Sequence, residues 1–137
     1  MLTRDQGYAL KAHKHVQKIH DQNEKPEAKK YGVMAHKLPI LIHNAGLIQA
    51  LAFVDARSNT TNKIQKKLLD DLADTIGKEN GKQLQQAARD SELVEYILLT
   101  KQIMNALLWY KRFAQSILDV DVSDIDDDDK GDTTSAD

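Results

Sequence analysis

The chain has 137 residues, the size of one domain, and it contains no cysteine, which excludes disulfides, thiolate zinc sites and iron–sulfur clusters. Its net charge of −2 conceals an asymmetry: residues 119–137 carry nine Asp and one Lys, whereas residues 1–118 carry 18 Lys and Arg against 12 Asp and Glu. We therefore expect a basic folded body, suited to an anionic partner, and an acidic tail.

The apolar segments are too short and too often interrupted to form a membrane span, which needs about 20 residues. The first residues also lack the apolar run of a secretory signal. The sequence thus predicts a cytoplasmic protein with no membrane partner.

Helical periodicity runs through the chain, and alternating strand patterns are almost absent. The first predicted helix spans residues 3–24. Thr3 can cap its N-terminus, and its apolar stripe consists of Tyr8, Ala12, Val16 and Ile19.

The next segment predicts a helical hairpin. Pro26 opens a helix over residues 27–37, and Leu38 and Pro39 predict a corner, because proline suits the first turn of a new helix. A short buried turn follows, Gly46 supplies a break, and residues 47–54 form a second helix that is apolar on nearly every side. Such a helix must be surrounded by others, so we expect this hairpin to lie in the core.

In the second half, residues 58–60 predict a turn with good N-cap residues ahead of an amphipathic helix over about 61–76. A short helix is expected over 82–88, and a last helix over about 91–118, apolar around most of its circumference. At ~1.5 Å per residue the last helix would be about 40 Å long, and the others would pack against it. The predicted fold is a compact, all-α, single-domain bundle of five to six helices over residues 1–118. Residues 119–137 cannot bury enough surface to offset the entropy of ordering, which predicts a disordered acidic tail.

Side chains that could catalyse a reaction or bind a metal form no recognisable arrangement. His13, His15 and His20 lack the i, i+4 spacing that places two imidazoles on one helix face, and we expect the histidines to be surface or half-buried polar groups. The tail begins like a calcium loop but has Asp124 and Lys130 where that loop needs Gly and Glu. The sequence predicts no catalytic residue, no metal and no cofactor.

The clearest candidate for a binding function is a basic row on the first helix. This row, which contains no acidic residue within its sector of about 80°, consists of Arg4, Lys11, Lys14 and Lys18. An unpaired row suits a phosphate backbone, although the same residues could form a solvated face that keeps the domain soluble. Lys111 and Arg112 on the last helix could extend the row or could simply reach out of the core into solvent.

Two segments resemble the small α-helical subunit of the Cmr complex, the type III-B CRISPR effector that uses a guide RNA to target RNA. The first runs from Lys37 to Phe53 and looks like the central signature of that family. The second runs from Tyr96 through Thr100 to Leu107–Ala114 and is similar to the family's C-terminal helix. Both occur in the family's order and separation, and the resemblance covers about residues 3–118.

The resemblance implies a non-catalytic role. Members of this family stack in several copies as a minor filament beside larger backbone subunits, and they help to hold the duplex of guide RNA and target RNA. We therefore expect the partners to be the other Cmr subunits, both RNAs and further copies of this chain. The expected RNA-binding residues are Arg4, Lys11, Lys14, Lys18, Lys111 and Arg112.

Two other interpretations stay open. One is a helical adaptor that binds only protein and has no nucleic-acid contact, and the other is a metal-dependent nuclease. Because a polyaspartate segment can occupy a basic face, the tail is expected to compete with RNA. Removing residues 119–137 should then leave the fold intact and tighten nonspecific RNA binding.

Overall fold

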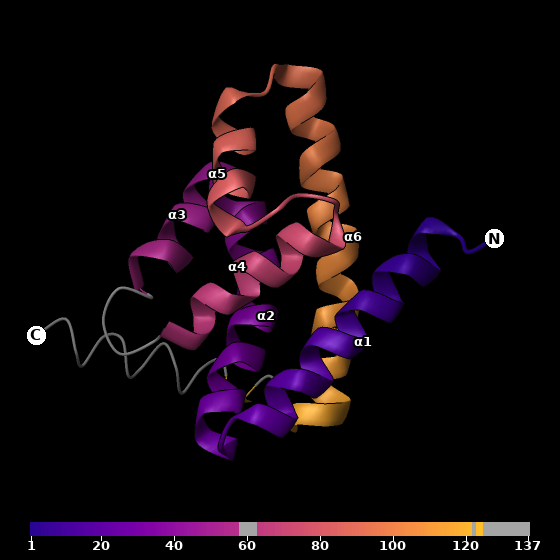
Figure 1. The fold of residues 1–137 in the computed structure, drawn as a ribbon. Helices are drawn as coiled ribbons and strands as arrows, with labels where there is room; N and C mark the ends of the chain where they lie inside the picture. Colours follow the sequence, from indigo (N-terminus) through magenta and orange to yellow (C-terminus); the bar gives the residue numbers. More distant parts are fainter. Residues whose placement is uncertain (58–62, 122, 125–137) are drawn as a thin grey trace, which may run out of the picture.

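A computed structural model describes residues 1–57, 63–121 and 123–124, and within them the chain forms six helices and no strand (Figure 1). The helices are α1 (Arg4–Gln22), α2 (Lys25–Ala45), α3 (Leu47–Arg57), α4 (Lys63–Thr75), α5 (Gly81–Asp90) and α6 (Leu93–Leu118). The predicted all-α fold with a long last helix is confirmed. The predicted turn at residues 58–60 and most of the predicted tail (122 and 125–137) lie outside the described residues.

α1 forms as its local sequence predicts. The N–H of Gln6 donates to the Thr3 hydroxyl at 3.0 Å, and the N–H of Thr3 donates to the Gln6 side-chain oxygen at 2.9 Å, which makes a reciprocal N-terminal cap. The predicted apolar stripe is the buried face of the helix, since its four residues all lie in the core. This face packs mainly against α6.

The predicted corner at Pro39 is wrong, because α2 runs without a break from Lys25 to Ala45. A proline inside a helix removes one N–H donor and crowds a carbonyl one turn earlier, which costs about 3 kcal/mol. Every residue from Tyr31 to Leu38 is buried, and the packing of α2 against α6 and α4 outweighs that cost. The predicted break at Gly46 is confirmed: this residue ends α2 with φ 88°, in the left-handed region that favours glycine.

The expectation that the helix after Gly46 is buried on all sides is also wrong. Ile48 and Phe53 of α3 are exposed, and the buried face consists of Leu47, Ala50, Leu51 and Val54. The first N–H groups of α3 are satisfied from α6, because the Tyr96 hydroxyl accepts from Leu47 at 3.0 Å and from Ile48 at 3.4 Å. α3 is therefore an amphipathic surface helix that is fastened to α6 at its start.

α4 and α5 complete the body. α4 turns Leu68, Leu69 and Leu72 into the core, and α5 packs against it. The start of α5 lies so close to α4 that a Cβ on Gly81 would be 2.8 Å from the Cβ of Leu69. The N–H of Gly81 donates to the Asp70 carboxylate at 2.7 Å, which fixes this approach.

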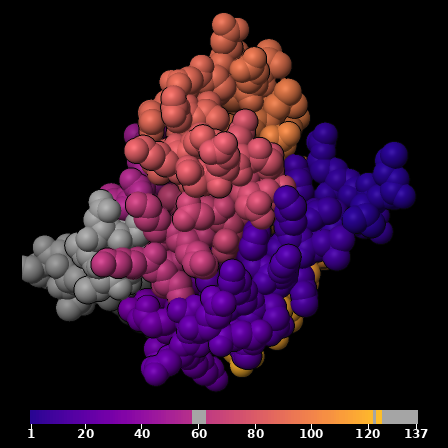
Figure 2. Space-filling model, in the orientation of Figure 1, coloured from indigo at the N-terminus to yellow at the C-terminus, as the bar shows by residue number. Residues whose placement is uncertain are grey.

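α6 is a core helix over only part of its length. From Leu99 to Leu118 its buried residues pack against α1 and α2, as expected for the central helix. Its first turns instead expose four apolar residues, which we call the apolar start of α6: Leu93, Val94, Ile97 and Leu98. Figures 1 and 2 show these turns together with α5 at one end of the molecule, and the N-terminal turns of α1 projecting from its side.

Packing continues beyond the last helix. Val120 is only 2% exposed and belongs to the core, so the packed body extends past residue 118, where the sequence places the boundary of the domain. Among the described helices, none combines the length and the apolar character that crossing a bilayer requires.

Candidate nucleic-acid interface

A polar cluster inside the bundle fixes the rotation of α1 about its own axis. His15 places Nε2 3.1 Å from the Asp74 carboxylate and Nδ1 2.6 Å from the Tyr110 hydroxyl. The Tyr110 hydroxyl also donates to the main-chain oxygen of Asp71 at 3.1 Å, and the Tyr31 hydroxyl donates to the Asp71 carboxylate at 2.6 Å. These bonds join α1, α2, α4 and α6, so α1 presents the same residues to solvent in every folded molecule.

Burial determines the protonation of this cluster. Removal from water raises the pKa of Tyr31 and that of Tyr110 well above their ordinary values, so both hydroxyls stay protonated and act as donors. Burial also raises the pKa of Asp71, although the hydrogen bond from Tyr31 opposes this effect. His15, Tyr31, Asp71, Asp74 and Tyr110 are thus bonded to one another, and this cluster serves to position helices.

The fixed rotation of α1 leaves Arg4, Lys14 and Lys18 exposed. Within the described parts of the chain, none of the three side chains forms an ion pair with a carboxylate. Lys14 and Lys18 are one helical turn apart on the same face, about 6 Å from each other. The structure therefore keeps these three members of the basic row available to an external anion.

The prediction that the whole basic row lacks counter-ions is wrong for Lys11. Its Nζ donates to the main-chain oxygen of Asp74 at 3.0 Å and lies 3.9 Å from the Asp74 carboxylate. This carboxylate belongs to α4, so no inspection of the first helix alone could reveal it. Both side chains are about half exposed, and a surface pair of this kind is worth only about 0–1 kcal/mol. A phosphate could replace it at little cost.

Lys111 and Arg112 point to different neighbours. The guanidinium of Arg112 lies over the Trp109 ring at 5.4 Å, and the Trp109 N–H donates to Asp5 near the start of α1 at 3.0 Å. Lys111 is close enough to His36 of α2 to lower its pKa, after the larger effect of burial. Arg112 therefore lies near the basic row, whereas Lys111 lies on the α2 side of the molecule.

The histidines vary in burial more than the sequence predicts. His13 is exposed, as expected, with its ring against Phe113. His36 is only 1% exposed and lies in the core, whereas the sequence predicts a surface or half-buried position. The Nδ1–H of His36 donates to the carbonyl of Gly32 at 3.1 Å. Among the described residues, no group of three or more His, Asp or Glu side chains could hold a metal ion.

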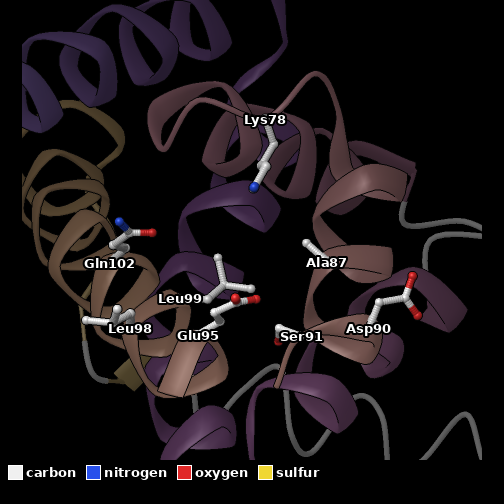
Figure 3. A pocket seen from close by; sticks show the side chains of 8 residues that line it. All are labelled: Lys78, Ala87, Asp90, Ser91, Glu95, Leu98, Leu99 and Gln102. Carbon is white, nitrogen blue, oxygen red and sulfur yellow. The ribbon is translucent and has the colours of Figure 1, made fainter. Parts of the chain in front are cut away.

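An open hollow of about 400 Å³ lies between α5 and α6 (Figure 3). Its apolar wall is formed by Leu98 and Leu99, and its charged residues are Lys78, Asp90 and Glu95. Two carboxylates and one ammonium group make this hollow unfavourable for phosphate. The candidate interface with nucleic acid is therefore the α1 face.

A second pair of cations, which was not predicted from the sequence, consists of Lys25 and Lys29, and we call it the α2 lysine pair. Their i, i+4 spacing on α2 is a signal that could have found them, since it places both on one helix face. Both are paired with carboxylates from the segment that follows α6. Lys29 Nζ lies 3.0 Å from Asp124 Oδ1, and Lys25 Nζ lies 4.0 Å from Asp119 Oδ2.

Comparisons with known proteins agree with this architecture. The chain is 41% identical over 119 residues to the CRISPR system Cmr subunit Cmr5 of Thermus thermophilus, covering 87% of this chain and 99% of that protein. The crystal structure of a CRISPR-associated Cmr5 family protein from the same organism superposes with a TM-score of 0.78 at 41% identity, over 85% of this chain and 98% of that one. A family model described as CRISPR-associated protein (Cas_Cmr5) matches residues 4–117. Since that match includes the first five helices and all of α6 except its last residue, the chain belongs to the Cmr5 family of CRISPR-associated proteins.

Proposed function

We propose that this protein is a non-catalytic small subunit of an RNA-guided type III-B CRISPR effector complex, which acts in the cytoplasm. Several copies stack beside the other Cmr subunits and stabilise the duplex of guide RNA and target RNA. The duplex lies along α1, where Lys14 and Lys18, together with Lys11, contact its phosphates. Arg4 and Arg112 extend this contact at its edge, and Lys111 contacts RNA from the α2 side.

The exposed, unpaired lysines of α1 carry this proposal. Lys14 and Lys18 have no carboxylate partner among the described residues, and the interior bonds of His15 hold the helix that carries them. Rigid placement lowers the entropy lost on binding. The weak pair of Lys11 and Asp74 adds a third cation that a phosphate can recruit.

A non-catalytic role is supported by what the interior titratable groups do. The bonds that join His15, Asp71 and Tyr110 lie between packed helices, and they connect to Tyr31 in the core. These groups are positioned to hold helices rather than to meet a substrate.

Stacking of copies is supported by two apolar surfaces on different stretches of α6. One is the apolar start of α6. The other is an open groove of about 400 Å³ between α1 and the later part of α6, lined by Leu2, Gln6, Ala9, Leu10, His13 and Phe113. Contact between the first surface of one copy and the second surface of the next would be heterologous, and repeated heterologous contacts build an open filament.

The charges near these two surfaces are complementary. Acidic residues flank the apolar start of α6, namely Asp90, Glu92 and Glu95. The residues that adjoin the groove in sequence include Arg4, Arg112 and Asp5, which together carry one net positive charge. Opposite charges at the rims favour a head-to-tail arrangement over contacts between like surfaces.

The test reverses the charge of the α1 lysines in the assembled complex. Lys14→Glu with Lys18→Glu should weaken retention of a guide–target duplex at least about tenfold and flatten its salt dependence, because two phosphate contacts are lost. Retention is measured by size-exclusion chromatography with a labelled duplex at several salt concentrations. The double variant Lys63→Glu with Lys82→Glu is the matched control, since it reverses two exposed lysines on α4 and α5.

Equal retention by the two double variants, with equal salt slopes, would contradict the RNA contact. An adaptor that binds only protein predicts that result, together with normal assembly of the complex. The exposed apolar start of α6 is the observation that favours this second candidate function.

A further inference from the structure

The chain after α6 turns back onto α2. Asp119 takes a left-handed conformation with φ 56°, and the N–H of Val120 donates to the carbonyl of Ala114 at 3.2 Å, which ends the helix and reverses the chain. Val120 packs against α2 at Gly32. Only glycine leaves room for it there, because a Cβ on residue 32 would lie 2.6 Å from Val120 Cγ2. Burial of this valine anchors the segment by packing alone.

The anchored segment delivers carboxylates to the α2 lysine pair. Asp124 lies 3.0 Å from Lys29, and its side chain is only 16% exposed. The N–H of Asp121 donates to Asp124 at 2.9 Å and, with Lys29, lowers the pKa of the Asp124 carboxyl, so that this group is an anion. Asp124 in turn raises the pKa of Lys29. The Asp124 carboxylate thus forms an ion pair with the Lys29 ammonium group of α2.

Lys111 approaches the same region from α6. α6 meets α2 at Gly32, where a Cβ would lie 3.3 Å from the Ala114 Cβ, and Lys111 is one helical turn before Ala114. Lys111 lowers the pKa of buried His36, which Asp121 and Asp124 raise. Within the described residues Lys111 has no ion pair of its own. Lys25, Lys29 and Lys111 therefore form one basic surface on two packed helices, and we call it the α2–α6 basic surface.

The segment has an anchor that does not depend on charge pairing. Lys25 and Asp119 are each 77% exposed, and such a pair adds little to stability. Val120 supplies an anchor that needs no charge. The carboxylates are therefore free to be exchanged for other anions while the segment stays attached.

We propose that the α2–α6 basic surface is a second phosphate-binding surface, and that the chain's own acidic C-terminal segment occupies it until RNA displaces the carboxylates. Asp126–Asp129 follow Asp124 after one residue and add four more acidic groups to the tethered competitor. The short tether keeps the carboxylates at a local concentration in the millimolar range near the lysines. Only a polyanion that binds at several points can compete with them. The inference rests on the proposed RNA contact.

The test compares RNA binding by full-length variants. In the first variant, Asp119, Asp124 and Asp126–Asp129 are replaced by Asn, and Val120 is kept. It should bind a fluorescein-labelled RNA duplex at least about fivefold more tightly in anisotropy titrations, with a salt slope steeper by one to two contacts. Adding Lys25→Gln and Lys29→Gln to this variant should abolish the gain.

The control replaces Lys63 and Lys82 by Gln in the same Asn background, which removes the same charge from other helices, and it should keep the gain. No gain in the first variant would overturn the proposal. An equal loss of gain in the two lysine variants would also overturn it, because net charge alone would then explain the effect. Circular dichroism confirms folding of each variant. Weak binding by Lys14→Glu with Lys18→Glu and no effect of the Asn replacements would reject this inference while leaving the proposed function intact.

Discussion

The exposed part of α6, Leu93–Leu98, and its buried part, Leu99–Leu118, are both rich in apolar residues and have different surroundings. In the buried part, Ile103, Leu107 and Tyr110 are fully buried against neighbouring helices. In the first turns, Leu93 is 73% exposed and Leu98 is 55% exposed. A helix shows the same apolar periodicity in both settings. The pattern therefore indicates that a helix face needs a packing partner, but not whether that partner belongs to the same chain.

The largest expected effect is on the buried part. Ile103→Ala should lower the free energy of unfolding by about 2–5 kcal/mol, because it leaves a cavity among packed helices. Leu98→Ala removes a similar volume from the exposed part and should change the stability by less than about 0.5 kcal/mol. Urea unfolding followed by circular dichroism measures both. Similar losses in the two variants would show that the two parts are packed alike.

The next effect concerns the polar bonds of the buried part. Tyr110→Phe keeps the ring but removes the hydroxyl that contacts His15, Thr75 and the main chain of Asp71. We expect a loss of about 1–3 kcal/mol, since the remaining buried groups lose a partner. Thermal unfolding provides the measurement, and Tyr8→Phe on α1 serves as a control. An unchanged melting temperature would mean that the cluster does not fix α1.

Tyr96 links the exposed part of α6 to the rest of the bundle. Its hydroxyl accepts from the first N–H groups of α3. Tyr96→Phe should cost about 0.5–1.5 kcal/mol, and amide hydrogen exchange should become faster at Leu47 and Ile48. Unchanged exchange at both amides would show that water satisfies these donors equally well.

The buried Asp71 should make the stability of the protein depend on pH. Its pKa is raised in the folded protein, mainly by burial, so folding favours the protonated form. The stability that Asp71 contributes is therefore full below its ordinary pKa of 3.8 and declines as the pH rises through the raised value. Asp71→Asn should gain stability relative to the parent protein between pH 3 and pH 7. A constant difference between the two unfolding curves would contradict the raised pKa.

The smallest effect on stability is expected from the exposed start of α6. Ile97→Ser with Leu98→Ser should leave the unfolding curve unchanged but weaken self-association, because the apolar surface offered to the next copy is lost. Sedimentation velocity at several concentrations measures the association. Ile40→Ser, at another exposed apolar position on α2, is the matched control. Identical association of all three proteins would remove this surface from the stacking proposal.

Local sequence signals predicted much of the fold. Thr3 and the stripe of α1 were identified correctly because capping and helical periodicity act within one turn or a few. Pro39 was misinterpreted because burial of the whole turn before it, a tertiary effect, overrides the local preference for a corner. The exposure of Ile48 and Leu98 could not be predicted, since their pattern is the same as that of core residues.

The candidate site shows the same division. Exposed Lys14 and Lys18 follow from the helical wheel of the first helix. The partner of Lys11 lies 63 residues away on α4, and no sequence rule places it there. Val120 and its seat at Gly32 were missed for the same reason, although they matter for any truncation. Deleting residues 119–137 would remove a core residue, so the cut that leaves the packed body whole lies after residue 124.

The rigidity of α6 has a consequence for assembly. If neighbouring copies meet through the apolar start of one α6 and the groove beside Phe113 of the next, the axial step is set by the helical rise between Leu98 and Phe113, about 22 Å. A helix cannot stretch to follow a change in the pitch of RNA. The number of nucleotides spanned by each copy would then be a fixed property of this protein. Only an insertion or deletion within α6 would change that number.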